Sequence, residues 1–214
     1  MTKLSGPMLA PRSGQPPRQI VVLLHGYGSD GADLIDLGRY WGEAMPDTLF
    51  VSPNAPNRCA GNPFGYEWFP LQVDRIAGRI EGAKQAAPVI RGFLDDLWAQ
   101  TGLGAADTFL VGFSQGAMMA LHVGTASESP FKGIVAFSGA LVPAEDFGAP
   151  GHARPPVALI HGDIDQVVDP QMSRDAETAL KSAGFEVSLL LCPGLGHGIS
   201  PEGLAAAAAF MHGR

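Results

Sequence analysis

Three residues of this chain have side chains that together can activate a hydroxyl group for attack on a carbonyl carbon. A serine, Ser114, is followed along the sequence by an aspartate, Asp165, and then by a histidine, His197. A serine hydroxyl is a weak nucleophile at neutral pH, so it needs an adjacent base, and the base needs a further group to orient it. The residue types and their order therefore predict covalent acyl transfer through a serine.

Ser114 lies in a segment that fits the pattern G-x-S-x-G, Gly112-Phe113-Ser114-Gln115-Gly116. An apolar, β-prone run at 108–111 precedes it, and a helix-forming run at 117–122 follows it. A strand, a sharp turn and a helix in this order build the nucleophile elbow of an α/β-hydrolase. The two glycines let neighbouring backbone pass close to the turn, because they carry no Cβ atom.

The acid and the base each have competitors in the sequence. Asp163 stands two positions before Asp165, but the dipeptide Gly162-Asp163 favours a turn in which the carboxylate bonds local backbone. Asp165 is preferred for this reason and, in part, for the family resemblance described below. His197 is flanked by glycines in a loop after the last predicted strand. His25 and His161 each precede a glycine at a strand end and are predicted to fix loop geometry. His152 and His212 are predicted to be solvated, and His122 is predicted to pack or face solvent.

The oxyanion of such a reaction needs two backbone N–H donors. One is expected from Gln115, the residue after the serine, and the other from Tyr27, in the loop after the first strand. The alternative for Tyr27 is that it is simply a loop aromatic. Phe64, Trp68 and Phe69, from an aromatic-rich segment, are candidate walls of an acyl groove together with the segment 139–156, and the alternative is that these aromatics belong to the core.

Strands and helices alternate along the chain, which predicts a mostly parallel sheet with helices on both faces. The chain is therefore expected to be a single α/β domain, 1–214, without a large lid domain. Two long segments, 53–73 and 139–156, show no clear period and are predicted to be loops. Strands are predicted at 20–24, 48–51, 107–113, 133–137, 157–160 and 186–191. Helices are predicted at 31–44, 74–100 with a kink or break at Pro88, 170–183 and 201–212.

Composition limits the partners and the location. The chain has 214 residues, 46% hydrophobic and 16% charged, with a net charge of −7, which argues against nucleic acid as a partner. No stretch resembles a signal peptide or reaches the length of a membrane span, so a cytoplasmic protein without stable membrane insertion is expected. Cys59 and Cys192 are expected to be reduced thiols. The sequence carries no metal-binding or dinucleotide motif, so no metal or cofactor is predicted.

Five segments together resemble the phospholipase/carboxylesterase family of small α/β-hydrolases, which includes the acyl-protein thioesterases. The resemblance implies Ser114 as nucleophile, His197 as base and Asp165 as acid, with Tyr27 and Gln115 as oxyanion donors. Tyr27 stands where many members carry an aliphatic residue, and the fit around Trp68 ends at Pro70. The segments are 24–28 (LHGYG), 52–56 (SPNAP), 112–116 (GFSQG), 161–168 (HGDIDQVV) and 196–199 (GHGI).

The leading hypothesis is a serine hydrolase that cleaves carboxylic esters or thioesters, with a small-molecule or lipid-like ester as substrate. A serine peptidase is one alternative, because the same residues can cleave amide bonds. A non-catalytic binding protein on a hydrolase fold is another, although the complete Ser, Asp and His set argues against it. A homodimer is kept as an open alternative to a monomer, since two-fold dimers are the commonest soluble oligomers.

Overall fold

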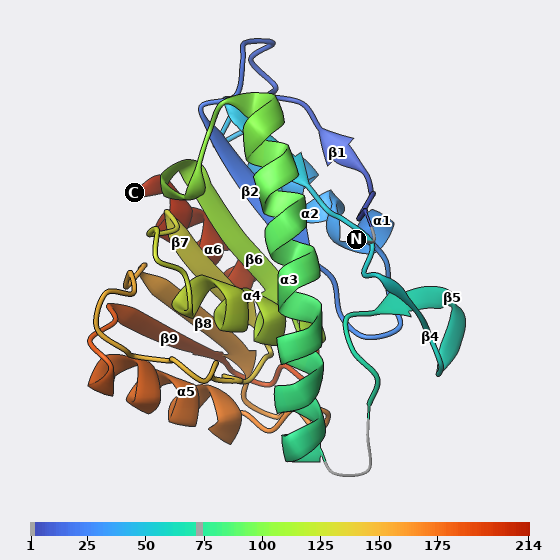
Figure 1. Cartoon of the computed structure of the whole chain (residues 1–214), viewed down its shortest axis with the longest axis vertical. Coiled ribbons are helices and arrows are strands. Elements are labelled where there is room, and N and C mark those ends of the chain that lie inside the picture. Colours follow the sequence, from blue (N-terminus) through green and yellow to red (C-terminus); the bar gives the residue numbers. More distant parts are fainter. Residues whose placement is uncertain (1–2, 72–74) are drawn as a thin grey trace.

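The fold is built on a seven-stranded sheet with the order β1-β3-β2-β6-β7-β8-β9 (Figure 1). It is seen in a computed structural model that describes residues 3–71 and 75–214. All neighbouring strands pair in parallel except β1, which pairs antiparallel with β3 at one edge. The strands are β1 (Met8–Leu9), β2 (Gln19–Leu24), β3 (Thr48–Val51), β6 (Thr108–Phe113), β7 (Gly133–Phe137), β8 (Val157–Gly162) and β9 (Val187–Cys192).

Helices cover both faces of the sheet, as predicted. On one face lie α3 (Arg75–Thr101), α4 (Gln115–Thr125) and α5 (Gln171–Ser182); on the other lie α1 (Gly31–Leu34), α2 (Asp36–Trp41) and α6 (Pro201–His212) (Figure 1). Strand β2 shows why two layers are needed, because successive side chains of a strand point to opposite faces. Ile20, Val22 and Leu24 join one apolar cluster, whereas Val21 and Leu23 join the other.

Three predicted elements differ in the structure. The segment 53–73, predicted to be a loop, contains an antiparallel hairpin of β4 (Asn57–Cys59) and β5 (Asn62–Glu67). Residues 72 and 73 of this segment lie outside the described part of the chain. The helix predicted at 31–44 is divided at Ile35 into α1 and α2. Helix α3 continues through Pro88 as one element instead of breaking there.

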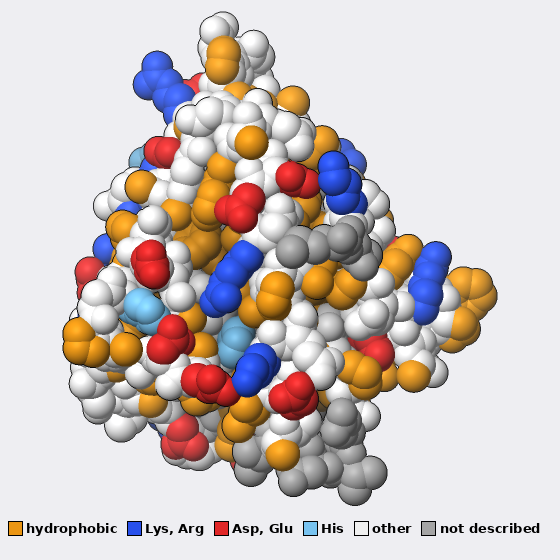
Figure 2. Space-filling view, in the orientation of Figure 1, with side chains coloured by type: hydrophobic (Ala, Val, Ile, Leu, Met, Phe, Trp, Pro, Cys, Tyr) orange, Lys and Arg blue, Asp and Glu red, His pale blue; other side chains and the backbone are white. Residues whose placement is uncertain are grey.

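On the described part of the face in Figure 2, acidic and basic side chains are interspersed and form no large area of one sign. The β4–β5 hairpin projects from the body of the molecule (Figures 1 and 2). Among the helices of residues 3–71 and 75–214, none has the length and hydropathy required to cross a bilayer.

Candidate active site

Ser114 occupies the sharp turn between β6 and α4. Its φ of 54° and ψ of −115° lie in a region that residues with a side chain rarely adopt, which is the strained conformation expected of an elbow. The flanking glycines make this turn feasible. A Cβ atom on Gly116 would lie 1.9 Å from the carbonyl oxygen of Leu24, and one on Gly112 would lie 2.3 Å from the carbonyl oxygen of Gly116. Neighbouring backbone therefore excludes side chains at both positions.

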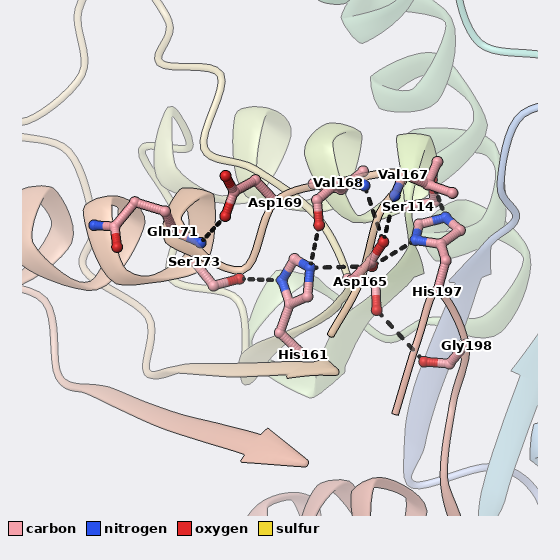
Figure 3. Close-up of polar contacts among 11 residues, drawn as sticks. Ser114, His161, Asp165, Val167, Val168, Asp169, Gln171, Ser173, His197 and Gly198 are labelled. Atoms are coloured by element: carbon pink, nitrogen blue, oxygen red, sulfur yellow. Dashed lines mark hydrogen bonds and ion pairs between the residues drawn. The ribbon is translucent and has the colours of Figure 1, made fainter. Parts of the chain in front are cut away.

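Ser114, His197 and Asp165 form a continuous hydrogen-bonded line (Figure 3). The Ser114 hydroxyl lies 3.0 Å from His197 Nε2, and His197 Nδ1 lies 2.7 Å from Asp165 Oδ2. Each residue follows a different strand, β6, β8 or β9, at the edge where the carboxyl ends of these parallel strands meet. The ring of His197 packs against Phe113, with 4.9 Å between ring centroids. This arrangement can carry a proton away from the serine hydroxyl.

Asp165 is held in its charged form. Burial would raise the pKa of this carboxyl, but hydrogen bonds from His197 and from the N–H groups of Val168 and Val167 outweigh it and leave the pKa below the ordinary value of 3.8. The two N–H groups donate to Asp165 Oδ1 at 3.0 and 2.8 Å. Asp163, the competing acid, accepts a hydrogen bond from the N–H of Gly194 instead, at 2.7 Å.

The loop after β2 lies beside the elbow. Gly26 approaches Phe113 and Ser114 so closely that a Cβ atom there would lie 3.1 Å from the Phe113 ring. Tyr27 follows in this loop and lines the same pocket as Ser114 and Gln115. Within the described residues, the N–H groups of Tyr27 and Gln115 have no acceptor in the protein. Both amides are thus available as donors to a ligand.

A pocket of about 580 Å³ opens beside Ser114 and His197. Of the three aromatic residues predicted to wall it, Phe69 lines the pocket. Trp68 is buried, 1% exposed, and donates its indole N–H to the carbonyl oxygen of His25, whereas Phe64 is 85% exposed on β5; neither of the two lines the pocket. No described residue of the segment 139–156 lines it. The wall is completed by other apolar residues and by two polar ones: Pro70, Leu71, Met118, Val167, Val168, Arg79 and Gln166.

Some contacts at the site were not expected from the sequence. The Gln115 side chain is buried and bridges two backbone groups: its Oε1 accepts from the N–H of Trp68 at 2.9 Å, and its Nε2 donates to the carbonyl oxygen of Phe69 at 2.7 Å. His161 contacts Asp165 as well as its own loop. The four-residue spacing of His161 and Asp165 did not predict this contact, because residues at that spacing are regular neighbours only on a helix.

The remaining histidines and the two cysteines have structural and not catalytic contacts. His25 accepts the N–H of Ala55 at Nε2, and His122 contacts the carbonyl oxygen of Val142, so both fix local backbone. His152, predicted to be solvated, has a side chain only 15% exposed, next to Asp146. Both cysteines are free and buried. Within residues 3–71 and 75–214, no three His, Cys, Asp or Glu side chains are placed to hold a metal ion.

The chain is similar to proteins named as esterases and thioesterases. Residues 10–213 match the family described as phospholipase/carboxylesterase. The chain is 33% identical to the esterase YpfH of Escherichia coli K12 over 190 residues, 86% of this chain and 78% of that protein. It is 29% identical to acyl-protein thioesterase 1 homolog 1 of Dictyostelium discoideum, over 85% and 84% of the two chains. The crystal structure of esterase PE8 is 55% identical, with a TM-score of 0.95 over 99% of both chains.

Proposed function

Because this chain belongs to the phospholipase/carboxylesterase family and is a hydrolase of carboxylic esters or thioesters, we propose that Ser114 is its nucleophile, His197 its general base and Asp165 its orienting acid. The observation that supports this assignment is the unbroken line of contacts, 3.0 Å from Ser114 to His197 and 2.7 Å from His197 to Asp165. These are the distances over which a general base removes a proton.

The proposed reaction has two steps. His197 takes the proton of Ser114 while the serine oxygen attacks the carbonyl carbon, and the alcohol or thiol leaves with a proton from His197. Water, deprotonated by His197, then attacks the acyl-enzyme and releases the carboxylic acid. In both steps the negative oxygen is stabilised by the N–H groups of Tyr27 and Gln115. Asp165 accepts the Nδ1–H of His197 and so keeps the imidazole in the tautomer whose unprotonated Nε2 faces the serine.

The acyl part of the substrate is proposed to lie along the apolar wall formed by Phe69, Leu71, Met118 and Val167. A pocket of about 580 Å³ with mainly apolar walls suits a small-molecule or lipid-like ester better than a peptide, whose backbone would need many polar partners. A homodimer and a cytoplasmic location stay predictions from the sequence.

Hydrolysis of p-nitrophenyl esters, from acetate to palmitate, tests the proposal. We expect Ser114→Ala to lower kcat by about 10⁴- to 10⁶-fold on every ester. Ser129→Ala, at an exposed serine, is the matched control and should retain wild-type activity. A serine-directed phosphonate should label the wild type and the control but not Ser114→Ala. Wild-type rates in Ser114→Ala, or labelling of another residue, would refute the assignment.

A further inference from the structure

Asp165 contacts a second buried histidine, His161, which lies on the side opposite His197 (Figure 3). His161 is the penultimate residue of β8, and its Nε2 lies 3.2 Å from Asp165 Oδ2 and 2.9 Å from the carbonyl oxygen of Val168. Its Nδ1 lies 2.7 Å from the hydroxyl of Ser173, in the first turn of α5. The side chains of His161 and Asp165 are both 0% exposed, so water does not compete for these contacts.

The surroundings of His161 select one tautomer. Two acceptors, a carboxylate oxygen and a carbonyl oxygen, face Nε2, so this nitrogen must carry a proton. In a neutral imidazole Nδ1 is then an acceptor, and the Ser173 hydroxyl supplies its proton. In the described part of the chain, His161 is the one hydrogen-bond partner seen for that hydroxyl. A neutral ring therefore satisfies every polar atom in this cluster.

We propose that His161, with its ring oriented by Ser173, is a positioning residue for the reaction at Ser114. This inference rests on the proposed function. The Nε2–H donates to Asp165 Oδ2, the same oxygen that accepts from His197, while Asp165 Oδ1 accepts from two backbone N–H groups. The carboxylate is thereby held in one orientation. The second donor also withdraws part of the negative charge that Asp165 presents to His197.

Other charged groups near this cluster are accounted for. Asp163 is turned toward the N–H of Gly194, and Asp169 accepts from the N–H of Gln171 at the start of α5. From α3, Arg79 lines the same pocket as His197. Among the described residues, the titratable groups seen in contact with Asp165 are the two imidazoles of His161 and His197. Removing the His161 donor should therefore act directly on the Asp165–His197 pair.

The pH dependence of kcat/KM distinguishes this role from simple packing. In His161→Leu, kcat/KM should fall by about 10- to 100-fold. The acid side of the profile should also move to higher pH by about half a unit, because Asp165 then stabilises a charged His197 more strongly. His161→Gln can again place an N–H near Asp165, and it should restore most of the rate and the wild-type profile. A profile that stays in place or moves to lower pH in His161→Leu would overturn the proposal.

Ser173→Ala tests the orientation of the ring without removing it, and so covers the case in which His161→Leu fails to fold. We expect the acid side of the kcat/KM profile to move to higher pH, as in His161→Leu, but by a smaller amount. The midpoint of His197, followed by NMR of labelled histidine in a Ser114→Ala background, should shift with it. This readout needs no activity, so it stands apart from the proposed function, which falls if Ser114→Ala remains active. An unchanged His197 midpoint in Ser173→Ala would overturn the proposal.

Discussion

Phe69 and Phe64 come from the same aromatic-rich segment but have very different surroundings. Phe69 lines the pocket beside Ser114 and packs against Gly82 of α3. A Cβ atom added to Gly82 would lie 2.5 Å from the Cβ atom of Phe69. Phe64 is almost fully exposed on the hairpin. An aperiodic aromatic run shows that large side chains are present but not which way they point, so the sequence could not separate the two.

We expect Phe69→Leu to change the acyl-chain preference and Phe64→Leu to leave it unchanged. Loss of the Phe69 ring enlarges the pocket, so kcat/KM for longer p-nitrophenyl esters should rise relative to shorter ones by about tenfold. Phe64→Leu is the matched control, since the same atoms are removed outside the pocket. Identical chain-length profiles for both variants and the wild type would exclude Phe69 as an acyl wall.

Gln115 shows how much one residue of the site was predictable. Its place after Ser114 in the motif predicts a role for its backbone N–H, because the turn itself presents that group. Its side chain instead joins the elbow to Trp68 and Phe69, far away in sequence. Two buried backbone groups thus depend on one amide, and losing either bond would leave an unsatisfied polar group. Such long-range pairings follow from the packed structure and from no local pattern.

At the scale of elements, the β4–β5 hairpin was missed because its sequence argues against strands. Pro63 and Gly65 both lie within β5, and the register shifts between Arg58 and Cys59. The hairpin is nevertheless tied to the loop that carries Tyr27. The N–H of Gly28 donates to the carbonyl oxygen of Tyr66 at 2.9 Å, and the N–H of Tyr66 donates to that of Ser29 at 2.8 Å. The hairpin therefore holds a proposed oxyanion donor in place.

Gly65→Ala should separate the hairpin from this loop. A Cβ atom on Gly65 would lie 2.0 Å from the carbonyl oxygen of Gly28, so one backbone must move. If that movement shifts the Tyr27 N–H, kcat should fall by about 10²-fold, the usual loss of one oxyanion donor. The measurement is kcat on p-nitrophenyl acetate together with the urea midpoint.

Gly92→Ala is the control, because it lies in α3 with no atom within 4 Å of an added Cβ. We expect full activity and a gain of about 0.5–1 kcal/mol in unfolding free energy, as for other Gly-to-Ala changes inside helices. A Gly65→Ala protein with wild-type kcat would show that the hairpin does not position the oxyanion loop.

At the scale of the molecule, the sheet was the most predictable feature. Continuous apolar runs such as 20–24 and 133–137 are typical of parallel strands buried on both faces, and they form β2 and β7. Because the carboxyl ends of parallel strands share an edge, the order of strands and loops along the chain was enough to predict that the Ser, Asp and His lie together. The two-residue edge strand β1 could not be predicted, since Met8–Leu9 is too short to show a period.

Two titration windows should govern the stability of the whole molecule in acid. The pKa of Asp165 lies below 3.8, so its contribution is present above that pH and is lost as the pH falls through the lower, folded value. As the pH falls, the buried histidines affect the stability at higher pH than Asp165 does. Burial lowers the pKa of His25 and of His122 below 6.5, despite opposing contacts with the carbonyl oxygens of Gly26 and Val142. As the pH falls, these two imidazoles are therefore protonated at higher pH in the unfolded chain than in the folded protein.

We expect the unfolding free energy to fall as the pH decreases below 6.5, by at most about 1.4 kcal/mol per pH unit for each of these two histidines. For His25 the geometry gives the reason, because the N–H of Ala55 donates to Nε2 and a proton there would abolish that bond. Urea unfolding at about pH 7, 6 and 5 measures the effect. His122→Gln should lose less stability over this range than the wild type, whereas His212→Gln, at an exposed position, should lose as much. Equal losses in both variants, or a stability independent of pH in the wild type, would show that the buried neutral histidines do not set the acid limit of the fold.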